Sequence, residues 1–170
     1  MAARFGAGEK TTPCSSATAI RGSPASRTPQ WSRGGWYHTC ALLEDETVKC
    51  WGDDDFDQLG DEGGERTDTP VAVQGLDGVV ELDVGDTHTC VRTDKGSVDC
   101  WGTDLEWFRS ETPVEIFGLS SGVVDVSVGG NHACAVKDNG EMYCWGANLN
   151  YVLGDQTESY RDRPVKVQFE

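Results

Sequence analysis

Residues 38–52 read HTCALLEDETVKCWG, and the two ends of this stretch decide the fold because they recur twice in the chain. The equivalent stretches are HTCVRTDKGSVDCWG at residues 88–102 and HACAVKDNGEMYCWG at residues 132–146. In each copy nine residues separate the two cysteines, whereas the copies begin 50 and then 44 residues apart. A constant inner spacing within a variable period predicts a rigid hairpin that is followed by a loop of variable length.

Each copy also contains the pattern of four short strands. Residues 79–85 (VVELDVG) and 123–129 (VVDVSVG) alternate apolar and polar side chains before the hairpin, as a strand does. A last strand follows the loop, with Pro70, Pro113 or Pro164 expected at its first position, where proline is tolerated. Four-stranded units repeated every ~40–50 residues are typical of propeller blades. The predicted fold is therefore all-β, a partial β-propeller of about three four-stranded blades at about residues 34–78, 79–122 and 123–170.

Centring each hairpin on its turn places its two cysteines opposite each other. The resulting pairs are Cys40–Cys50, Cys90–Cys100 and Cys134–Cys144. Directly opposed side chains have Cβ atoms ~4.5–5.5 Å apart, close to what a disulfide needs, so we expect three disulfides. Zinc ligation and reduced thiols are the alternatives, but each copy offers only one histidine and two cysteines on one face, fewer ligands than a structural zinc site needs. The seventh cysteine, Cys14, has no partner in this scheme.

The same register predicts the surroundings of the repeated tryptophan and histidine residues. It sets each tryptophan opposite a small side chain and each histidine opposite a glycine, which leaves room for an indole and an imidazole. These equivalent positions are held by Trp51, Trp101 and Trp145, and by His38, His88 and His132. Catalysis needs a unique constellation rather than three equal copies. We therefore expect a structural role for these residues, and no catalytic residue and no cofactor in the chain.

The repeated motif resembles the regulator-of-chromosome-condensation repeat, most closely its bacterial, cysteine-bearing extracellular form. The shared features are Gly-x-x-His, a turn of the Asp-x-Gly type, Trp-Gly, and the downstream Leu59-Gly60 and Leu153-Gly154, with Asn148 at the position of the family's loop asparagine. The resemblance covers about residues 34–170. It implies a propeller, which in this family typically closes with about seven blades. Because this chain holds about three, we expect further blades or self-association to complete the ring.

The middle copy departs from the motif, because it lacks Leu-Gly and has ten residues between Gly102 and Pro113 where the other copies have seventeen. Trp107, Phe108 and Arg109 lie in this shortened loop, and aromatic side chains beside an arginine are typical binding anchors. They are equally suited to filling the space that the missing Leu-Gly leaves. In the first copy, residues 29–33 (PQWSR) do not alternate, so no good strand is expected before His38.

The charge of the chain is unevenly distributed. Of the net charge of −15, residues 1–35 contribute +4 (five basic residues against Glu9), which leaves −19 for the remainder. Clustered Lys and Arg would be needed to neutralise phosphates, so we expect no nucleic-acid binding. No stretch approaches the ~20 apolar residues that span a bilayer. Residues 1–33 are rich in Ser, Thr, Pro, Ala and Gly and predict a disordered leader without the apolar core of a secretory signal.

An acidic run follows the first Trp-Gly and invites a calcium hypothesis. Its members are Asp53, Asp54, Asp55, Asp57, Asp61 and Glu62. The alternate aspartates begin like an EF-hand loop, but Gln58 stands where that loop needs glycine and Gly64 stands where it needs the closing glutamate. We therefore expect a solvent-exposed loop without a bound metal, and a calcium site is the alternative.

Three classes of function remain for such a chain. The first is a non-enzymatic protein-interaction module, extracellular or at the cell surface, because paired cysteines indicate an oxidising compartment and blade loops present variable side chains on a rigid scaffold. Its protein partner is not identified by the sequence. The second, which the family resemblance implies, is an intracellular propeller that exchanges guanine nucleotides on a small GTPase or associates with chromatin. The third is a glycan-acting enzyme, which needs two carboxylates at one site. We favour the first.

Overall fold

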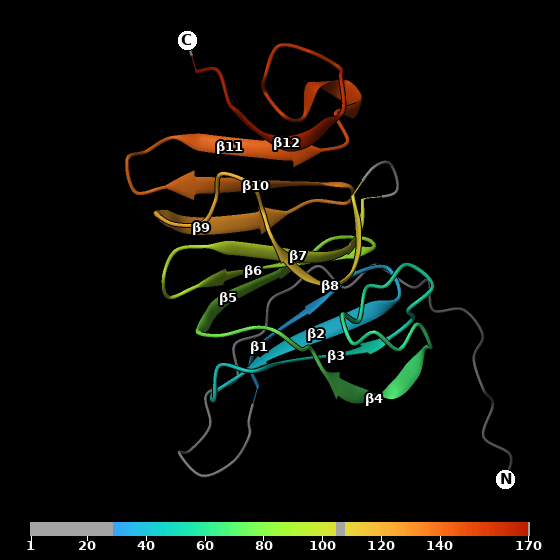
Figure 1. Ribbon diagram of the computed structural model, residues 1–170. Coiled ribbons are helices and arrows are strands. Elements are labelled where there is room, and N and C mark those ends of the chain that lie inside the picture. The colour runs from blue at the N-terminus through green and yellow to red at the C-terminus, as the bar shows by residue number, and fades with distance from the viewer. Residues whose placement is uncertain (1–28, 105–107, 170) are drawn as a thin grey trace, which may run out of the picture.

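Three four-stranded antiparallel sheets follow one another along the chain in the computed structural model, which describes residues 29–104 and 108–169 (Figure 1). In each sheet the strands are hydrogen-bonded in sequence order, so each sheet is one repeat and is called a blade below. The first blade consists of β1 (Pro29–Gly34), β2 (His38–Leu43), β3 (Val48–Gly52) and β4 (Thr67–Ala72). The second consists of β5 (Val79–Val84), β6 (His88–Thr93), β7 (Val98–Thr103) and β8 (Arg109–Glu115). The third consists of β9 (Val123–Val128), β10 (His132–Lys137), β11 (Met142–Gly146) and β12 (Arg161–Lys166), with the short 3-10 helix η1 (Leu149–Tyr151) before its last strand.

The central hairpin of each blade has the predicted register. In the first blade Cys40 lies opposite Cys50, and the next two pairs toward the start of β2 each join a small residue to a large one, Thr39 to Trp51 and Gly52 to His38. The other two hairpins repeat this register. All three cysteine pairs form disulfides, and in each pair the two Cα atoms lie 4.1 Å apart.

The first blade has a complete inner strand, which differs from the expectation that residues 29–33 belong to an unstructured leader. β1 pairs antiparallel with β2, with Gly34 opposite Thr39 and a bulge between Pro29 and Trp31. β5 has the same irregularity between Val79 and Glu81, so the bulge does not account for the missing alternation. Ser32 and Gly34 instead occupy the positions that Leu82 and Val84 hold in β5. The leader predicted for residues 1–28 lies outside the described residues.

The repeated prolines lie inside the outer strands β4, β8 and β12 rather than at their first positions. β4 begins at Thr67, three residues before Pro70. β8 begins at Arg109, four residues before Pro113, and β12 begins at Arg161, three residues before Pro164. Each of these strands is the last in its sheet, so one of its sides is not paired within the blade. An edge strand tolerates proline because its missing N–H can face away from the sheet.

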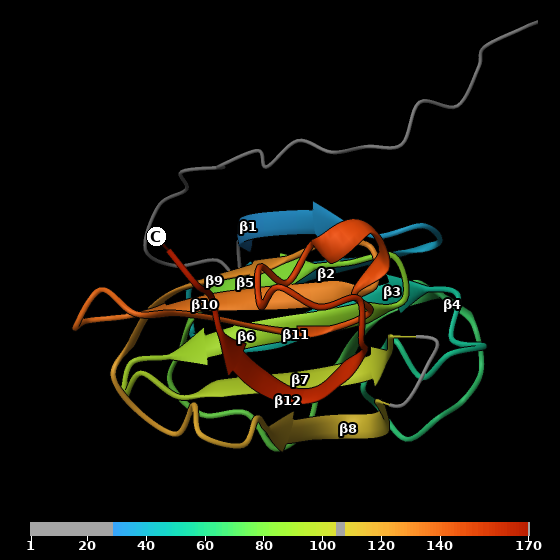
Figure 2. The same cartoon turned by 90° about the horizontal axis from the view of Figure 1, so that it is seen from above.

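The blades stack against one another, and their first strands lie side by side (Figures 1 and 2). Apolar side chains fill both junctions. The junction of the first two blades joins Cys40, Leu42, Val48, Cys50, Leu59 and Val73 to Leu82, Val84, Val91 and Trp101. The second junction joins Cys90, Val98, Cys100, Ile116 and Leu119 to Val123, Val126, Ala133, Ala135 and Trp145. Burial between blades, rather than within a blade, therefore supplies the core, as in other repeat architectures.

Of the helical segments in the described residues, none is long and apolar enough to cross a membrane.

Candidate interaction surface

One end of the blades carries the two longest connections between strands, residues 53–66 and 147–160. Because β2 begins opposite the end of β3, the turn before β2 and the loop after β3 emerge at the same end. The same holds for the other two blades. We call this end the loop face: it is formed by the turns 35–37, 85–87 and 129–131 and by the loops that follow Gly52, Gly102 and Gly146. Loops on a rigid scaffold are where binding residues concentrate.

The three turns of the loop face are held together by backbone hydrogen bonds between blades. The N–H of Trp36 donates to the carbonyl oxygen of Asp86 at 3.1 Å, and the N–H of Asp86 donates to that of Gly130 at the same distance. The glycine that begins each turn permits this approach, because a Cβ on Gly85 would lie 2.3 Å from the carbonyl oxygen of Gly129. The turns are therefore fixed relative to one another, so side chains on them have defined positions.

Each loop after Trp-Gly is organised by one side chain at the third residue after the tryptophan. Asp54 Oδ1 accepts a hydrogen bond from the N–H of Leu59 at 2.8 Å, and Asn148 Oδ1 accepts one from the N–H of Leu153 at 3.0 Å. In the shortened middle loop, Asp104 Oδ1 accepts from the N–H of Phe108 at 3.0 Å. The run of acidic residues concealed this role of Asp54 in the sequence. Its equivalence to Asn148 across the repeat is the signal that identifies it.

A change of Asp54 to Ala should destabilise the first blade. Asp54 is only 3% exposed, so its loss leaves the buried N–H of Leu59 without an acceptor, which costs about 1–3 kcal/mol. Asp54→Asn is the matched control. It keeps the acceptor that Asn148 supplies in the third blade, and it removes a carboxyl whose pKa burial raises. Thermal melts followed by circular dichroism should show a lower Tm for Asp54→Ala and no loss for Asp54→Asn; equal losses would contradict this role.

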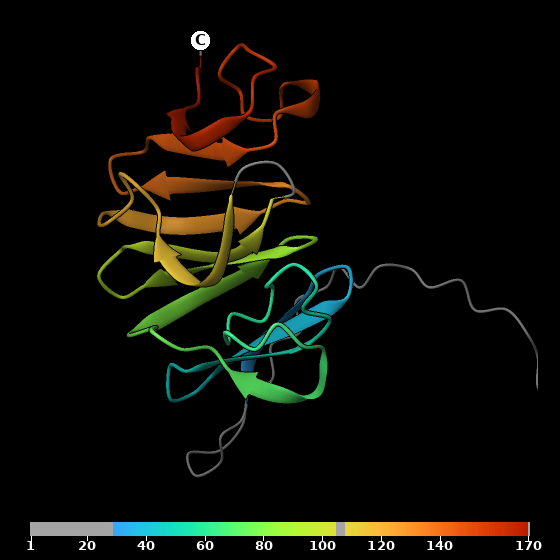
Figure 3. The ribbon, with the colours of Figure 1, turned by 45° about the vertical axis from the view of Figure 1, so that its right-hand side comes forward.

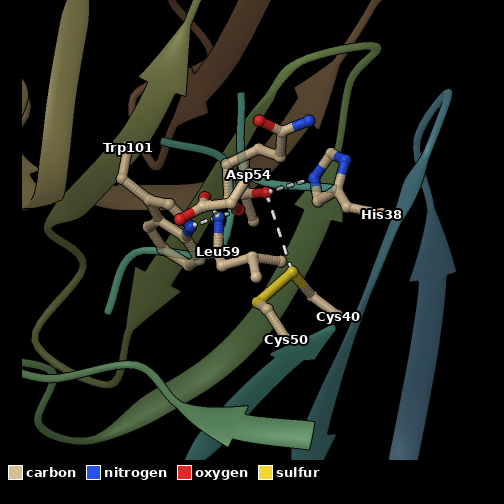
Figure 4. Close-up of a disulfide and its surroundings, with 8 residues drawn as sticks. His38, Cys40, Cys50, Asp54, Leu59 and Trp101 are labelled. Atoms are coloured by element: carbon tan, nitrogen blue, oxygen red, sulfur yellow. Dashed lines mark hydrogen bonds between the residues drawn. A yellow bond between two sulfur atoms is a disulfide. The ribbon is translucent and has the colours of Figure 1, made fainter. Parts of the chain in front are cut away.

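The repeated tryptophan and histidine residues join neighbouring blades (Figure 4). The indole Nε1 of Trp101 donates to the carbonyl oxygen of Gln58 in the first loop at 3.0 Å, and Leu59 packs in the same junction. His38 Nε2 lies 3.1 Å from Thr89 Oγ1 of the second blade. Burial lowers the pKa of both His38 and His88 to about 4, so both rings are neutral at pH 7. At the first junction both residue types therefore join one blade to the next.

The three residues proposed from the sequence as binding anchors do not form one exposed group in the described residues. Trp107 lies outside them. The Phe108 side chain is half-buried and packs against the core between the second and third blades. The Arg109 guanidinium forms an ion pair with Asp57 of the first loop, across the first junction. Their role in binding stays a prediction.

The acidic run forms the wall of a small polar cavity. This cavity has a volume of about 240 Å³ and is lined by Asp54, Asp57, Glu62, Gly63, Gly64 and Glu111. Across residues 29–104 and 108–169, no group of three or more His, Cys, Asp or Glu side chains is placed to hold a metal ion. The expectation that this loop folds without calcium remains a prediction.

Two exposed aromatic side chains mark the loop face beside this acidic loop. Trp36 is 60% and Tyr37 is 71% exposed, and their rings meet edge to face with centroids 6.3 Å apart. The N–H of Asp53 donates to the carbonyl oxygen of Tyr37 at 2.9 Å, which joins the aromatic turn to the start of the acidic loop. This pair was not predicted from the sequence. The available signal was the repeat itself, because the equivalent positions in the other turns hold Asp86-Thr87 and Gly130-Asn131.

A family model decides which repeat this is. The model of the regulator of chromosome condensation (RCC1) repeat matches residues 34–58, 79–104 and 123–151, one segment in each blade. These three segments are RCC1 repeats. The resemblance inferred from the sequence is confirmed at this level, and each matched segment of the RCC1 repeats contains the His and Trp-Gly positions of its blade.

Solved structures share this fold. Human WBSCR16 is similar with a TM-score of 0.69 and 23% identity over 81% of this chain and 39% of that chain. Prp20p from Saccharomyces cerevisiae is similar with a TM-score of 0.73 and 21% identity over 83% of this chain and 38% of that chain. The chain thus spans less than two-fifths of the length of either protein. At these identities the likeness concerns the fold, three RCC1-type propeller blades, and not the partner.

Proposed function

We propose that this chain is a non-enzymatic protein-interaction module that works in an oxidising compartment, extracellular or at the cell surface, and binds a protein partner through the loop face. The observation that carries the proposal is the exposed pair Trp36–Tyr37 on a turn that two backbone hydrogen bonds and glycine packing hold rigid. Tryptophan and tyrosine are the side chains most enriched at binding hot spots. A turn that is already ordered loses little conformational entropy when a partner binds.

The charge beside the aromatic pair defines the class of partner. The loop that begins at Asp53 carries seven acidic residues against the single basic residue Arg66 over positions 53–66. Complementary charge accelerates encounter and fixes orientation more than it adds affinity. The partner of the loop face is therefore a protein surface rich in Lys and Arg, with an apolar pocket for the aromatic pair.

The three disulfides support the proposed location. Disulfides persist in secreted and surface proteins, whereas cytosolic thiols are kept reduced. Each of the three joins directly opposed cysteines in a hairpin, and the first two lie in the blade junctions, so the oxidised form is part of the scaffold that presents the loop face.

Affinity capture with variants of the full chain tests this proposal. Trp36→Ala/Tyr37→Ala should lower the capture of its partner from solubilised cell-surface extracts at least tenfold, and wild-type capture should fall as salt is raised. Phe117→Ala is the matched control: Phe117 is 69% exposed but lies between β8 and β9, at the opposite end of the blades. Capture that is unchanged in the double variant, or reduced equally by Phe117→Ala, would contradict a binding role for the loop face.

A further inference from the structure

The two internal junctions are built from the same pair of blade faces. Each blade presents its histidine and disulfide to the next blade, and we call this its forward face. Each blade presents the small residue and tryptophan of its hairpin to the previous blade, and we call this its rear face. At the first junction the forward face supplies His38 and the carbonyl of Gln58, and the rear face supplies Thr89 and Trp101.

The forward face of the third blade is the uncovered copy of this surface. His38 and His88 are 3% exposed, whereas the equivalent His132 is half-buried. The same change occurs at two further positions. Cys40 and Cys90 are fully buried and Val48 and Val98 nearly so, but their equivalents Cys134 and Met142 are partly exposed.

The rear face of the first blade is uncovered in the same way. Thr89 and Trp101 have no exposed surface, whereas the equivalent Thr39 and Trp51 are partly exposed. The first and third blades lie at opposite ends of the stack, so the two uncovered faces point away from each other (Figure 3). The chain therefore carries both halves of its own junction at its two ends.

We infer that a second copy of this chain seats the rear face of its first blade on the forward face of the third blade. The contacts repeat those of the first internal junction. His132 faces Thr39 of the second copy, as His38 faces Thr89. Trp51 of the second copy donates to the carbonyl before Leu153, as Trp101 donates to the carbonyl before Leu59.

Glycine geometry is compatible with this contact. Gly35 packs on the carbonyl of Gly85, and Gly85 packs on that of Gly129, at distances that exclude a Cβ. Gly129 is the third glycine of the series, so it can pack on the carbonyl of Gly35 in a second copy. The two faces differ from each other, and such head-to-tail contacts close a ring or continue as a filament.

Mass measurements on the full chain test this inference independently of the proposed function, because the contacts named above do not use the side chains of Trp36 and Tyr37. The chain mass is 18.4 kDa, so light scattering behind size exclusion should give about 37 kDa or more, rising with protein concentration. The net charge of −15 opposes self-association, so raised salt should favour the oligomer. Capture of a basic partner should show the opposite salt dependence and weaken as salt is raised. A mass of 18.4 kDa at all concentrations and salt levels would overturn the inference.

Two variants that each block one face test the head-to-tail geometry. Thr39→Arg blocks the rear face and Met142→Arg blocks the forward face, so each variant alone should have the monomer mass. A mixture of the two retains one intact pair of faces and should form a heterodimer, which also shows that both variants are folded. Val114→Arg, at an exposed position on the outer strand of the middle blade, is the control and should behave as wild type. Oligomers that persist in either single variant, or a mixture that stays monomeric, would refute the assignment.

Discussion

Reduction of the three hairpin disulfides should unfold the described blades at room temperature. Each disulfide joins cysteines ten positions apart, and in the chain-entropy model a loop of this length contributes roughly 2–3 kcal/mol. Three such contributions sum to about 8 kcal/mol, against a whole-domain stability of about 5–15 kcal/mol. Loss of all three therefore removes most of the free energy that separates the folded and unfolded chain.

Circular dichroism and thermal melts with and without a reducing agent measure this effect, and thiol alkylation with mass spectrometry confirms that reduction is complete. Variants that each lack one disulfide show which of the three contributes most to stability. Cys90→Ala/Cys100→Ala should cost more than Cys134→Ala/Cys144→Ala, because the middle disulfide is buried in a junction whereas Cys134 is partly exposed. A fully reduced chain that melts within a few degrees of the oxidised one would contradict the prediction.

Acidification should weaken the blade junctions through two buried histidines. Desolvation lowers the pKa of both His38 and His88 from 6.5 to about 4, and each ring is also disfavoured as a cation by the next histidine in the series. Among the described residues, the Nδ1 atoms of both rings are buried without a hydrogen-bond partner, so an added proton finds no acceptor. Two nearby carboxylates, Asp53 and Asp104, offset part of this effect.

The sign of the pH dependence follows from the lowered pKa values. Between pH 6.5 and 4 the unfolded chain binds protons that the folded chain does not, so stability is complete above pH 6.5 and falls as the pH drops. One pKa unit corresponds to about 1.4 kcal/mol, so each imidazole accounts for about 3 kcal/mol over this range. Burial raises the pKa of Asp54, Asp86 and Asp99, and these carboxyls act in the opposite direction.

Melting temperatures from pH 7.5 to 4 isolate the histidine contribution when variants are compared. His38→Gln retains a group that can reach Thr89 but cannot titrate, so its Tm should fall less steeply with pH than that of wild type. His132→Gln is the control with the smaller expected change, because its ring is only half-buried. A Tm of wild type that is flat over this range, or equal slopes in all three proteins, would show that the buried rings do not set the acid stability.

The parts of the fold that the sequence predicted are those that three copies specify together. The spacing of Cys40 and Cys50 and its two equivalents gives the hairpin register, because a one-residue shift in any copy would separate the pair. β1 was missed because Ser32 and Gly34 occupy the two positions that are apolar in β5 and β9. Its structure depends on pairing with β2, which is a tertiary contact rather than a local pattern.

The functional surface was less predictable for a related reason. Repeats identify what is shared, whereas a binding surface is made of residues that differ between copies. Trp36 and Tyr37 belong to no repeated pattern, and the structure shows that their side chains are exposed on an ordered turn. Arg109, in contrast, was predicted to be a binding anchor. In the structure its guanidinium forms an ion pair with Asp57.

The prolines inside β4, β8 and β12 have a consequence for aggregation. An outer strand with a free side is a template on which a foreign strand can add and start amyloid-like sheet extension. Pro70, Pro113 and Pro164 each remove one backbone donor from such a strand, one per blade. The outer edge formed by β4, β8 and β12 is therefore a poor nucleus for cross-β growth. The apolar faces of the first and third blades stay available for ordered stacking.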